Sequence, residues 1–132
     1  MKAILKSHRV ESHSPEHVNY TLVYLDSITN FNELDYLNVE LDIGSENSKG
    51  SDQFSFSVFT DEYFFSKYEP KMLKIWDRDL VLPWGEKITK EIILNRINQA
   101  LKDAQGETWD DIVRHLCKYF YWEFEGEYGV PK

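Results

Sequence analysis

Alternating apolar and polar positions predict several strands in the first two-thirds of the chain. Residues 36–43 alternate Leu, Val, Leu and Ile with polar residues, and residues 54–58 alternate Phe, Phe and Val with serines. This period of two is typical of strands with one buried face. The polar, turn-rich residues 44–52 lie between the two runs, so we predict an antiparallel hairpin. Residues 2–10, 18–28 and 80–82 predict three further strands, residues 61–68 a helical turn, and residues 83–85 a turn.

The last third of the sequence has helical periodicity. Residues 88–104 place one apolar face at helical spacing, formed by Ile88, Ile92, Ile93, Ile97, Ala100, Leu101 and Ala104. Gly106 then stands where a C-cap glycine is expected. Thr108 and Asp111 have the spacing of a capping box, which predicts a second helix from Trp109 with an apolar face that continues to Phe120.

Strands followed by a helical pair indicate an α+β fold. We expect a mainly antiparallel sheet from the N-terminal two-thirds, with a C-terminal two-helix hairpin packed on one of its faces. The 132 residues fit one domain, spanning residues 1–132. With 42% hydrophobic and 15% aromatic residues, the chain is too apolar to be disordered.

Composition also suggests where the protein works. No apolar run reaches the roughly 20 residues of a membrane helix, and the apolar stretch at residues 3–5 is too short for a secretory signal. A single cysteine, Cys117, cannot form an internal disulfide, which fits a reducing compartment. We therefore expect a cytoplasmic protein that does not bind membranes.

The net charge of −8 narrows the choice of partner. A strongly acidic protein repels phosphate backbones, so direct nucleic-acid binding is not expected. The same charge would attract a basic protein, although solubility alone explains it equally well. Most of the acids fall in two segments, at residues 33–52 and 107–128, and each segment has six carboxylates.

Twenty aromatic residues accompany this charge: eight Phe, eight Tyr and four Trp. Aromatic side chains between acidic ones suit a protein interface, where the rings supply binding energy and the charges supply steering. For Phe54, Phe56, Trp109 and Phe120 we favour a place in the core. Tyr36, Trp84 and Tyr128 stand beside turns or acidic residues, and for these both interpretations stay open.

Motifs for catalysis or metal binding are weak. There is no GxxxxGK[ST], GxGxxG, CxxC or GxSxG pattern. His13 and His17 are four residues apart, but Pro15 disfavours a helix between them and two ligands are too few for zinc. His115 and Cys117 are two apart on a predicted helix and would not face each other.

Two groups of carboxylates could act as acid and base or hold a cation. Asp77 and Asp79 flank Arg78, and Glu123, Glu125 and Glu127 alternate near the C-terminus, where a strand would place them on one face. A solvated surface is the commoner role for such groups. We expect no enzymatic activity, no metal and no cofactor.

The C-terminal part of the chain resembles a known family. The residues that carry the likeness are the strand 54–60, the short strand near Leu80, the helix ending near Gly106, Trp109 at the next helix start, and Trp122-Glu123-Phe124-Glu125. Together they resemble the immunity protein 8 family of bacterial polymorphic-toxin systems. The likeness covers residues 36–128, and the spacing from Trp109 to Trp122 is its most specific part.

The resemblance implies an α+β protein that binds and neutralises a bacterial toxin. It carries over no catalytic residues, and it implies framework roles for Trp109, Trp122 and Phe124. Phe124 follows Trp122 by two residues, so a short strand would place both on one side. The expected mechanism is occlusion of a basic toxin surface, such as that of a nuclease, by a monomer or homodimer. The partner-binding residues predicted around the hairpin are Asp35, Tyr36, Glu40, Asp42, Glu46 and Asp52.

Two other hypotheses stay open. A non-catalytic regulatory or scaffold domain would use the same kind of surface for a cellular protein, and only a toxin gene beside this one separates the two. An enzyme using Asp77, Asp79 or the tail carboxylates would need a deep polar pocket with perturbed carboxylate pKa values.

Overall fold

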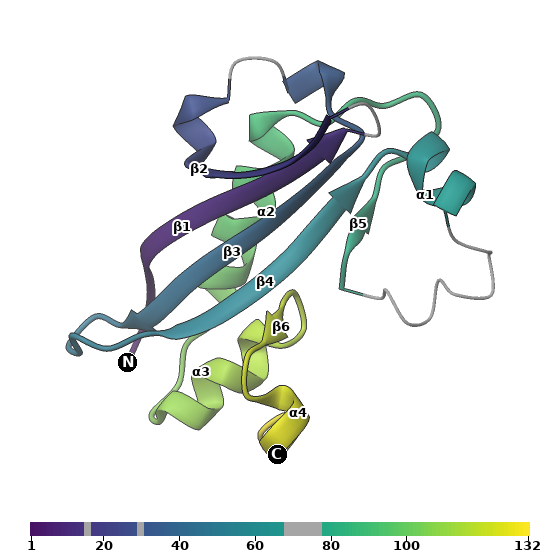
Figure 1. Cartoon of the computed structure of the whole chain (residues 1–132). Helices are drawn as coiled ribbons and strands as arrows, with labels where there is room; N and C mark the ends of the chain where they lie inside the picture. Colours follow the sequence, from purple (N-terminus) through teal and green to yellow (C-terminus); the bar gives the residue numbers. More distant parts are fainter. Residues whose placement is uncertain (15–16, 29–30, 68–77) are drawn as a thin grey trace.

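The structure, a computed structural model, describes residues 1–14, 17–28, 31–67 and 78–132. It is an α+β fold, as the sequence predicts (Figure 1). The elements in order are β1 (Ala3–Ser14), β2 (His17–Val23), the 3-10 turns η1 (Leu25–Ser27) and η2 (Phe31–Glu33), β3 (Tyr36–Ser45), β4 (Asp52–Phe59), α1 (Asp61–Lys67), β5 (Leu80–Val81), α2 (Lys90–Asp103), α3 (Trp109–Leu116), β6 (Tyr121–Trp122) and α4 (Glu125–Tyr128).

The described strands form one mainly antiparallel sheet. Its order is β2-β1-β3-β4-β5. The short strand β6 is outside this order and pairs with Phe54 and Ser55 of β4. The predicted hairpin is confirmed: β3 and β4 are antiparallel, with Leu41 opposite Phe54 and Tyr36 opposite Phe59. Both strands reach into the stretch predicted as loop, which leaves residues 46–51 outside them. β5 is the exception in direction, since it runs parallel to β4.

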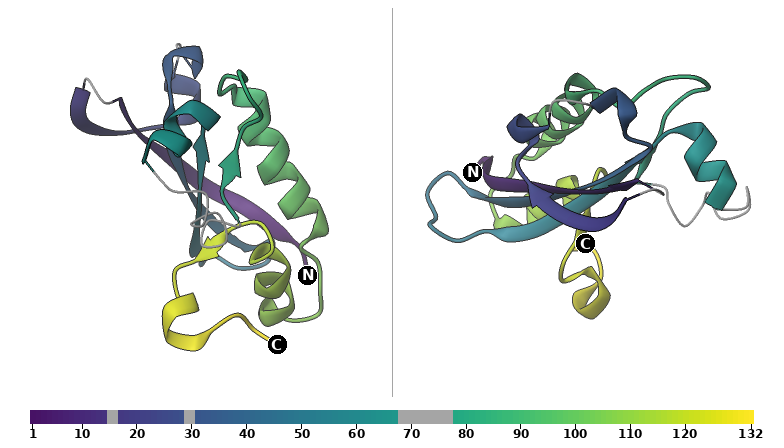
Figure 2. Two further views of the ribbon diagram at one scale, coloured as in Figure 1. Left: turned by 90° about the vertical axis from the view of Figure 1, so that its right-hand side faces the viewer. Right: turned by 45° about the horizontal axis from the view of Figure 1, so that its top comes forward.

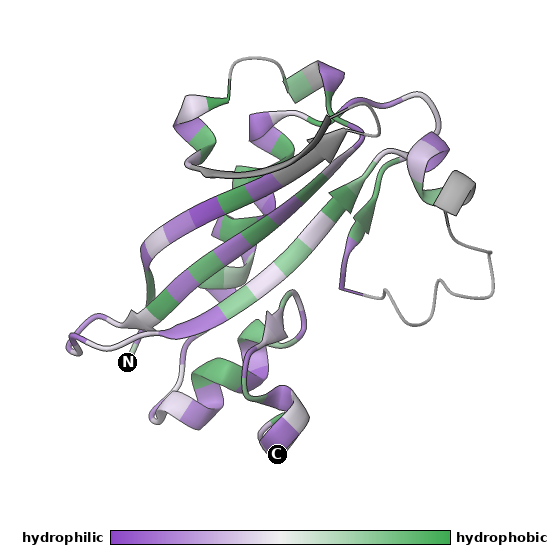
Figure 3. Ribbon diagram, viewed as in Figure 1, coloured by the Kyte–Doolittle hydropathy of each residue, from purple (hydrophilic) through white to green (hydrophobic). Residues whose placement is uncertain are grey.

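One face of this sheet forms the core. Apolar residues alternate with polar ones along β3 and β4 (Figure 3). The apolar residues of this alternation are buried. Helices α2 and α3 cover this face, while the opposite face of the central strands turns away from them (Figure 2). The largest buried side chains are Phe54, Phe56, Phe59, Phe64, Phe120, Leu25, Leu37, Leu41, Ile43, Ile88, Ile93 and Ile97.

Helix α2 begins where Thr89 caps it by accepting a hydrogen bond from the Ile92 amide. It ends at Asp103, and its C-cap is Ala104 with a φ of −85°, so the prediction of Gly106 as C-cap was wrong. Gly106 has a different role, because a Cβ there would lie 2.4 Å from the Cβ of Asp111. Its missing side chain lets the start of α3 pack closely against this connection.

Helix α3 has the predicted capping box: Thr108 accepts from the Asp111 amide, and the Asp111 carboxylate accepts from the Thr108 amide. The helix is shorter than predicted and ends at Leu116. Phe120 therefore lies beyond the helix, yet it is fully buried and stacks on Phe56 with ring centroids 5.3 Å apart. A turn brings it back to the core, and helical periodicity cannot reveal that.

The N-terminal strands also differ from the prediction. β1 is longer, reaching Ser14, whereas β2 ends at Val23 rather than at residue 28. The chain leaves the sheet there because Leu25 enters the core from η1, with its amide donating to Nε2 of His8. Apolar content alone did not distinguish this turn, in which Leu25 alone is buried, from a continuing strand.

The tail folds back as a helix. β6 contains Tyr121 and Trp122 alone, so Phe124 does not follow on the same strand as predicted. Its ring still contacts Trp122 edge-on at 5.5 Å. Glu125 and Glu127 lie in α4, so the expectation that the tail carboxylates share one strand face was also wrong.

Candidate functional site

The open face of the sheet contains two of the predicted binding residues together. Glu40 and Asp42 are neighbours on this face of β3, and Arg9 of β1 lies between them. Arg9 Nε donates to Oε2 of Glu40 at 2.6 Å, and its Nη1 donates to Oδ2 of Asp42 at 3.0 Å. Ser7 also donates to Asp42. The three charged side chains stay partly exposed, so they form a polar strip with two negative charges and one positive charge.

Asp52 has a different environment. It pairs with Ile43, so it points to the helix side of the sheet. Its Oδ2 accepts two hydrogen bonds, from the indole nitrogen of Trp109 at 2.9 Å and from that of Trp122 at 3.0 Å. The carboxylate therefore joins β4 to α3 and β6, and it is a framework contact as well as a predicted binding residue.

Asp35 and Tyr36 lie at the other end of β3. The Thr60 amide donates to the Asp35 carbonyl at 3.0 Å. Tyr36 packs on Phe59 and Tyr63, with ring centroids 5.1 and 6.0 Å away. With Phe64, which packs edge-on against Phe59, these rings attach α1 to the end of the open face. Tyr36 is thus a half-buried part of a small aromatic cluster.

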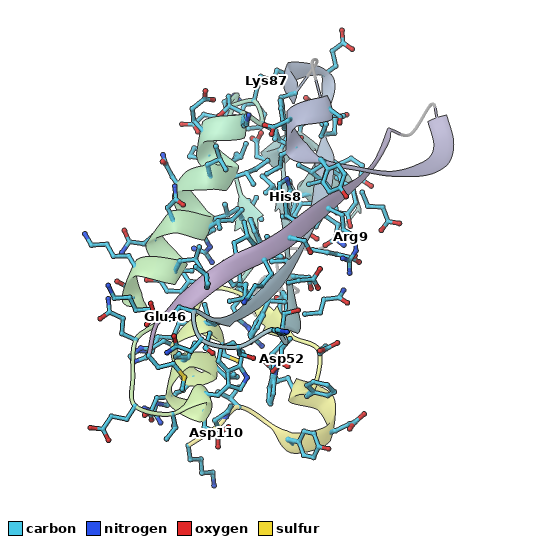
Figure 4. All side chains as sticks on the ribbon, turned by 90° about the vertical axis from the view of Figure 1, so that its left-hand side faces the viewer. His8, Arg9, Glu46, Asp52, Lys87 and Asp110 are labelled. Carbon is cyan, nitrogen blue, oxygen red and sulfur yellow. The ribbon has the colours of Figure 1, made fainter. Side chains whose placement is uncertain are left out.

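The six predicted residues do not form one patch. Glu46 is exposed at the hairpin turn, beside the N-terminus (Figure 4). The strand from Tyr36 to Ser45 has ten residues, which at about 3.3 Å per residue spans roughly 30 Å. Glu40 and Asp42 occupy its middle, and Asp35 lies beyond its far end. The hairpin thus spreads the predicted residues along the whole molecule and over both faces of the sheet.

A surface hollow lies at the hairpin end of the sheet. It has a volume of about 320 Å³. Its lining comes from the N-terminus, the hairpin and the start of α3, namely Met1, Gly44, Ser45, Ser48, Gly50, Ser51, Asp52 and Trp109. Gly44 is required here, since a Cβ would lie 2.2 Å from the Gly50 carbonyl oxygen. Asp52 is the single titratable side chain in this lining, so the hollow lacks the group of such side chains expected of a catalytic pocket.

The structure distinguishes among the aromatic residues for which the sequence left both a core and a surface position open. Trp84 is 88% exposed and Tyr128 is 73% exposed, whereas Tyr36 is half-buried. Phe54, Phe56 and Phe120 are buried in the core as expected, and Trp109 is partly buried against Asp52. Trp84 and Tyr128 lie in the connection before α2 and in α4, so they belong to different regions of the surface.

The tail carboxylates serve partly as structural contacts. Both oxygens of Glu125 accept from the Arg78 guanidinium, at 2.5 and 2.6 Å. Arg78 also donates to the carbonyls of Cys117 and Phe120 and lies over the Tyr121 ring. Arg78 lowers the pKa of Glu125 by stabilising its charged form.

The Cys117 thiol lies beside this ion pair. Burial raises its pKa to about 12, and the Glu125 carboxylate adds to the effect. A thiol in this state is protonated at neutral pH and is a poor nucleophile. Its position agrees with the prediction that it packs against the core as a small hydrophobe.

Several of the remaining candidates for catalysis or metal binding lie outside the described residues. His13 and His17 lie in β1 and β2, but their side chains, like Pro15, Glu16 and Asp77, fall outside the described residues. Asp79 accepts a hydrogen bond from the Ser57 amide at 2.7 Å. Across residues 1–14, 17–28, 31–67 and 78–132 there is no group of three or more metal-binding side chains. Nor does any helix in these segments have the length and apolarity to cross a membrane.

Comparison with protein families identifies the family of the chain. A family model described as Immunity protein 8 matches residues 5–128, nearly the whole chain. The chain belongs to the immunity protein 8 family. Membership makes it an immunity protein, whose partner is a cognate toxin. No curated protein and no solved structure matched it. The match reaches 31 residues further toward the N-terminus than the expected likeness, and so includes β2 and most of β1.

Two features of this immunity protein were not predicted from the sequence. The first is Arg9, which pairs with acids 31 and 33 residues away because β1 lies beside β3. The order of the strands was not known from the sequence. The second is the neighbourhood of Trp84, where the start of α1 meets the connection before α2. The position of Trp84 in a predicted turn was the available signal.

Proposed function

We propose that this immunity protein neutralises its toxin by binding and covering a basic surface on it. The observation that carries the proposal is the family match over residues 5–128. The net charge of −8 supports an electrostatic component, since acidic and basic partners attract each other over distances of several ångströms. A nuclease would fit well, because its active site must hold phosphate groups.

The proposed contact surface is the acidic side of the β3–β4 hairpin. Glu40 and Asp42 present carboxylates from the open face, and Glu46 presents one from the turn. Asp35 and Tyr36 extend this surface toward α1. Asp52 supports it from behind, by joining the hairpin to α3 and β6 through the two indoles.

The open face has a chemistry that suits a polar protein interface. Beside the charged strip, Asn38 and Ser57 are hydrogen bonded across β3 and β4 at 3.2 Å. Gln53 and Ser55 share this face. Short hydroxyl and amide side chains on a rigid sheet can donate and accept hydrogen bonds without ordering long side chains, which lowers the entropic cost of binding.

Arg9 affects both the geometry and the charge of this surface. Its guanidinium holds Glu40 and Asp42 in fixed positions and reduces their repulsion. A basic side chain of the toxin could then approach two pre-oriented carboxylates. We further propose that the protein acts in the cytoplasm as a monomer or homodimer, without an enzymatic step, and protects the cell by blocking the toxin's active site.

Co-expression tests the proposal. The chain is produced together with the C-terminal toxin domain encoded beside its gene, and cell survival and complex formation are measured. Glu46→Lys reverses an exposed charge on the proposed surface, and Glu91→Lys makes the same change on the exposed side of α2. We expect the wild type and Glu91→Lys to protect, and Glu46→Lys to protect less. Cell death with soluble wild-type protein and no complex would show that this toxin is not its partner.

A further inference from the structure

A second acidic feature lies at the end of the molecule away from the hairpin turn. The start of α1 and the connection between β5 and α2 enclose a hollow of about 230 Å³, lined by Thr60, Asp61, Glu62, Trp84, Gly85, Glu86 and Lys87. We call it the Trp84 notch. Lys87 marks this end in Figure 4, opposite Glu46, Asp52 and Asp110. The two segments that form it are more than 20 residues apart in sequence.

Trp84 contributes little to the fold. A turn closed by the hydrogen bond from the Glu86 amide to the Pro83 carbonyl, 3.0 Å, holds its backbone. Gly85 takes a φ of +80°, a value that favours glycine. The turn presents the indole to solvent with 88% of its surface exposed. A large ring held this way is costly in water and is typical of a binding anchor.

The environment of Asp61 provides a second, independent observation. Its residue is only 6% exposed, yet its carboxylate has no hydrogen bond or ion pair with any described residue. The neighbouring Thr60 hydroxyl accepts from the Tyr63 amide as the cap of α1. Among the described residues, Arg96 Nε is the one fully shielded side-chain atom without a hydrogen-bond partner, so the Asp61 oxygens stay open to the hollow beside the Trp84 ring. They are therefore placed to accept hydrogen bonds from a group that enters.

The charge of the notch indicates which kind of chemical group would enter it. Asp61, Glu62 and Glu86 supply three carboxylates, against the single ammonium of Lys87. Lys87 forms no ion pair within the described segments. A cation that can lie on an indole face and donate to a carboxylate matches this lining, and the planar guanidinium of arginine does both.

We propose that the Trp84 notch receives an arginine or lysine side chain of the cognate toxin. The inference rests on the proposed function, and it adds a specific anchor to the electrostatic attraction proposed above. The cation would lie on the Trp84 ring, donate to Asp61, and be flanked by Glu62 and Glu86. The Asp61 residue is only 6% exposed, so water would screen this contact less than it screens a surface ion pair.

Affinity measurements with the toxin domain test the notch. Trp84→Ala and Asp61→Asn are compared with Tyr128→Ala, which removes another exposed aromatic residue, 73% exposed and also next to a glutamate. We expect each notch variant to weaken binding by about tenfold or more, and Tyr128→Ala by less than about twofold. Equal binding by all three variants would overturn the notch and leave the proposed function intact.

A probe that does not involve the toxin separates the two proposals. N-acetyl-arginine amide and its neutral analogue N-acetyl-citrulline amide are titrated into labelled protein, and the indole N–H resonance of Trp84 is followed by NMR. We expect that resonance to shift with the arginine compound alone, and the shift to disappear in Asp61→Asn. Identical responses to both compounds would overturn cation recognition even if the toxin binds. A positive response without toxin binding would support the notch and count against the proposed function.

Discussion

A single oxygen of Asp52 accepts the indole N–H of Trp122, and the same oxygen accepts that of Trp109. The two tryptophans are 13 residues apart, one at the start of α3 and one in β6. Both elements are thereby fixed to the first residue of β4. The tryptophan spacing that was part of the family resemblance is therefore the distance along the chain between two donors to one carboxylate.

Removal of this carboxylate should destabilise the protein. Asp52→Ala leaves two partly buried indole N–H groups without their acceptor, and we expect a loss of about 2–3 kcal/mol in the free energy of unfolding. Asp52→Asn keeps an acceptor oxygen and should lose less. Urea denaturation measures both. Glu46→Ala, an exposed acid in the same hairpin, should stay within about 0.5 kcal/mol of the wild type. Equal stability of Asp52→Ala and the wild type would mean that the indole contacts do not support the fold.

Gly106 should tolerate no side chain. In Gly106→Ala the new Cβ would lie 2.4 Å from the Asp111 Cβ, and the capping box of α3 would have to move. We expect a loss of about 1–3 kcal/mol by thermal or urea unfolding. Gly126→Ala is the matched control, because nothing lies within 4 Å of its Cβ. A Gly106→Ala protein as stable as that control would show that the connection relaxes freely.

The Arg78–Glu125 pair should make stability depend on pH on the acid side. Arg78 lowers the pKa of Glu125, so the pair's contribution is complete above the unfolded pKa of about 4.3 and is lost as the pH falls through the lower folded value. At neutral pH, Glu125→Gln should be less stable by about 1–2 kcal/mol. The difference from the wild type should shrink as acid is added.

Glu127→Gln is the control for this effect. It makes the same change on α4 at an exposed position. Its stability should follow that of the wild type from about pH 7 down to about pH 3. If Glu125→Gln and Glu127→Gln gave the same curves, the ion pair would make no measurable contribution.

Cys117 should react slowly in the folded protein. Its thiol is buried and its pKa is raised to about 12, so almost none is thiolate at pH 8. We expect alkylation by iodoacetamide to be at least about a hundredfold slower in buffer than in denaturant. Mass spectrometry after timed quenching measures both rates. Fast labelling under native conditions would place the thiol at the surface.

The sequence predicted well those features that depend on local pattern. Strict alternation in residues 36–43 identified β3, and the Thr108–Asp111 pair identified the start of α3. Errors arose where a tertiary contact replaces a local one. Gly106 resembled a helix cap but is small because Asp111 packs on it, and Phe120 is buried by a turn beyond its helix.

The surroundings of the proposed contact residues were harder to predict because they depend on strand order. Glu40 and Asp42 were chosen for their charge, but their relation to Arg9 requires β1 to lie beside β3. Asp52 was chosen for the same reason, although its register places it on the helix side. The Trp84 notch joins two distant segments, so only its exposed tryptophan could be suspected from the sequence.

The salt dependence of toxin binding tests the central claim most directly. The affinity of the purified chain for its cognate toxin domain is measured by calorimetry between about 50 mM and about 500 mM NaCl. If an acidic surface covers a basic one, the complex is tight at low salt and weakens at least about tenfold over this range, while the chain stays folded. A tight complex with unchanged affinity at all salt concentrations would contradict electrostatic occlusion. No complex at low salt would contradict binding of this toxin altogether.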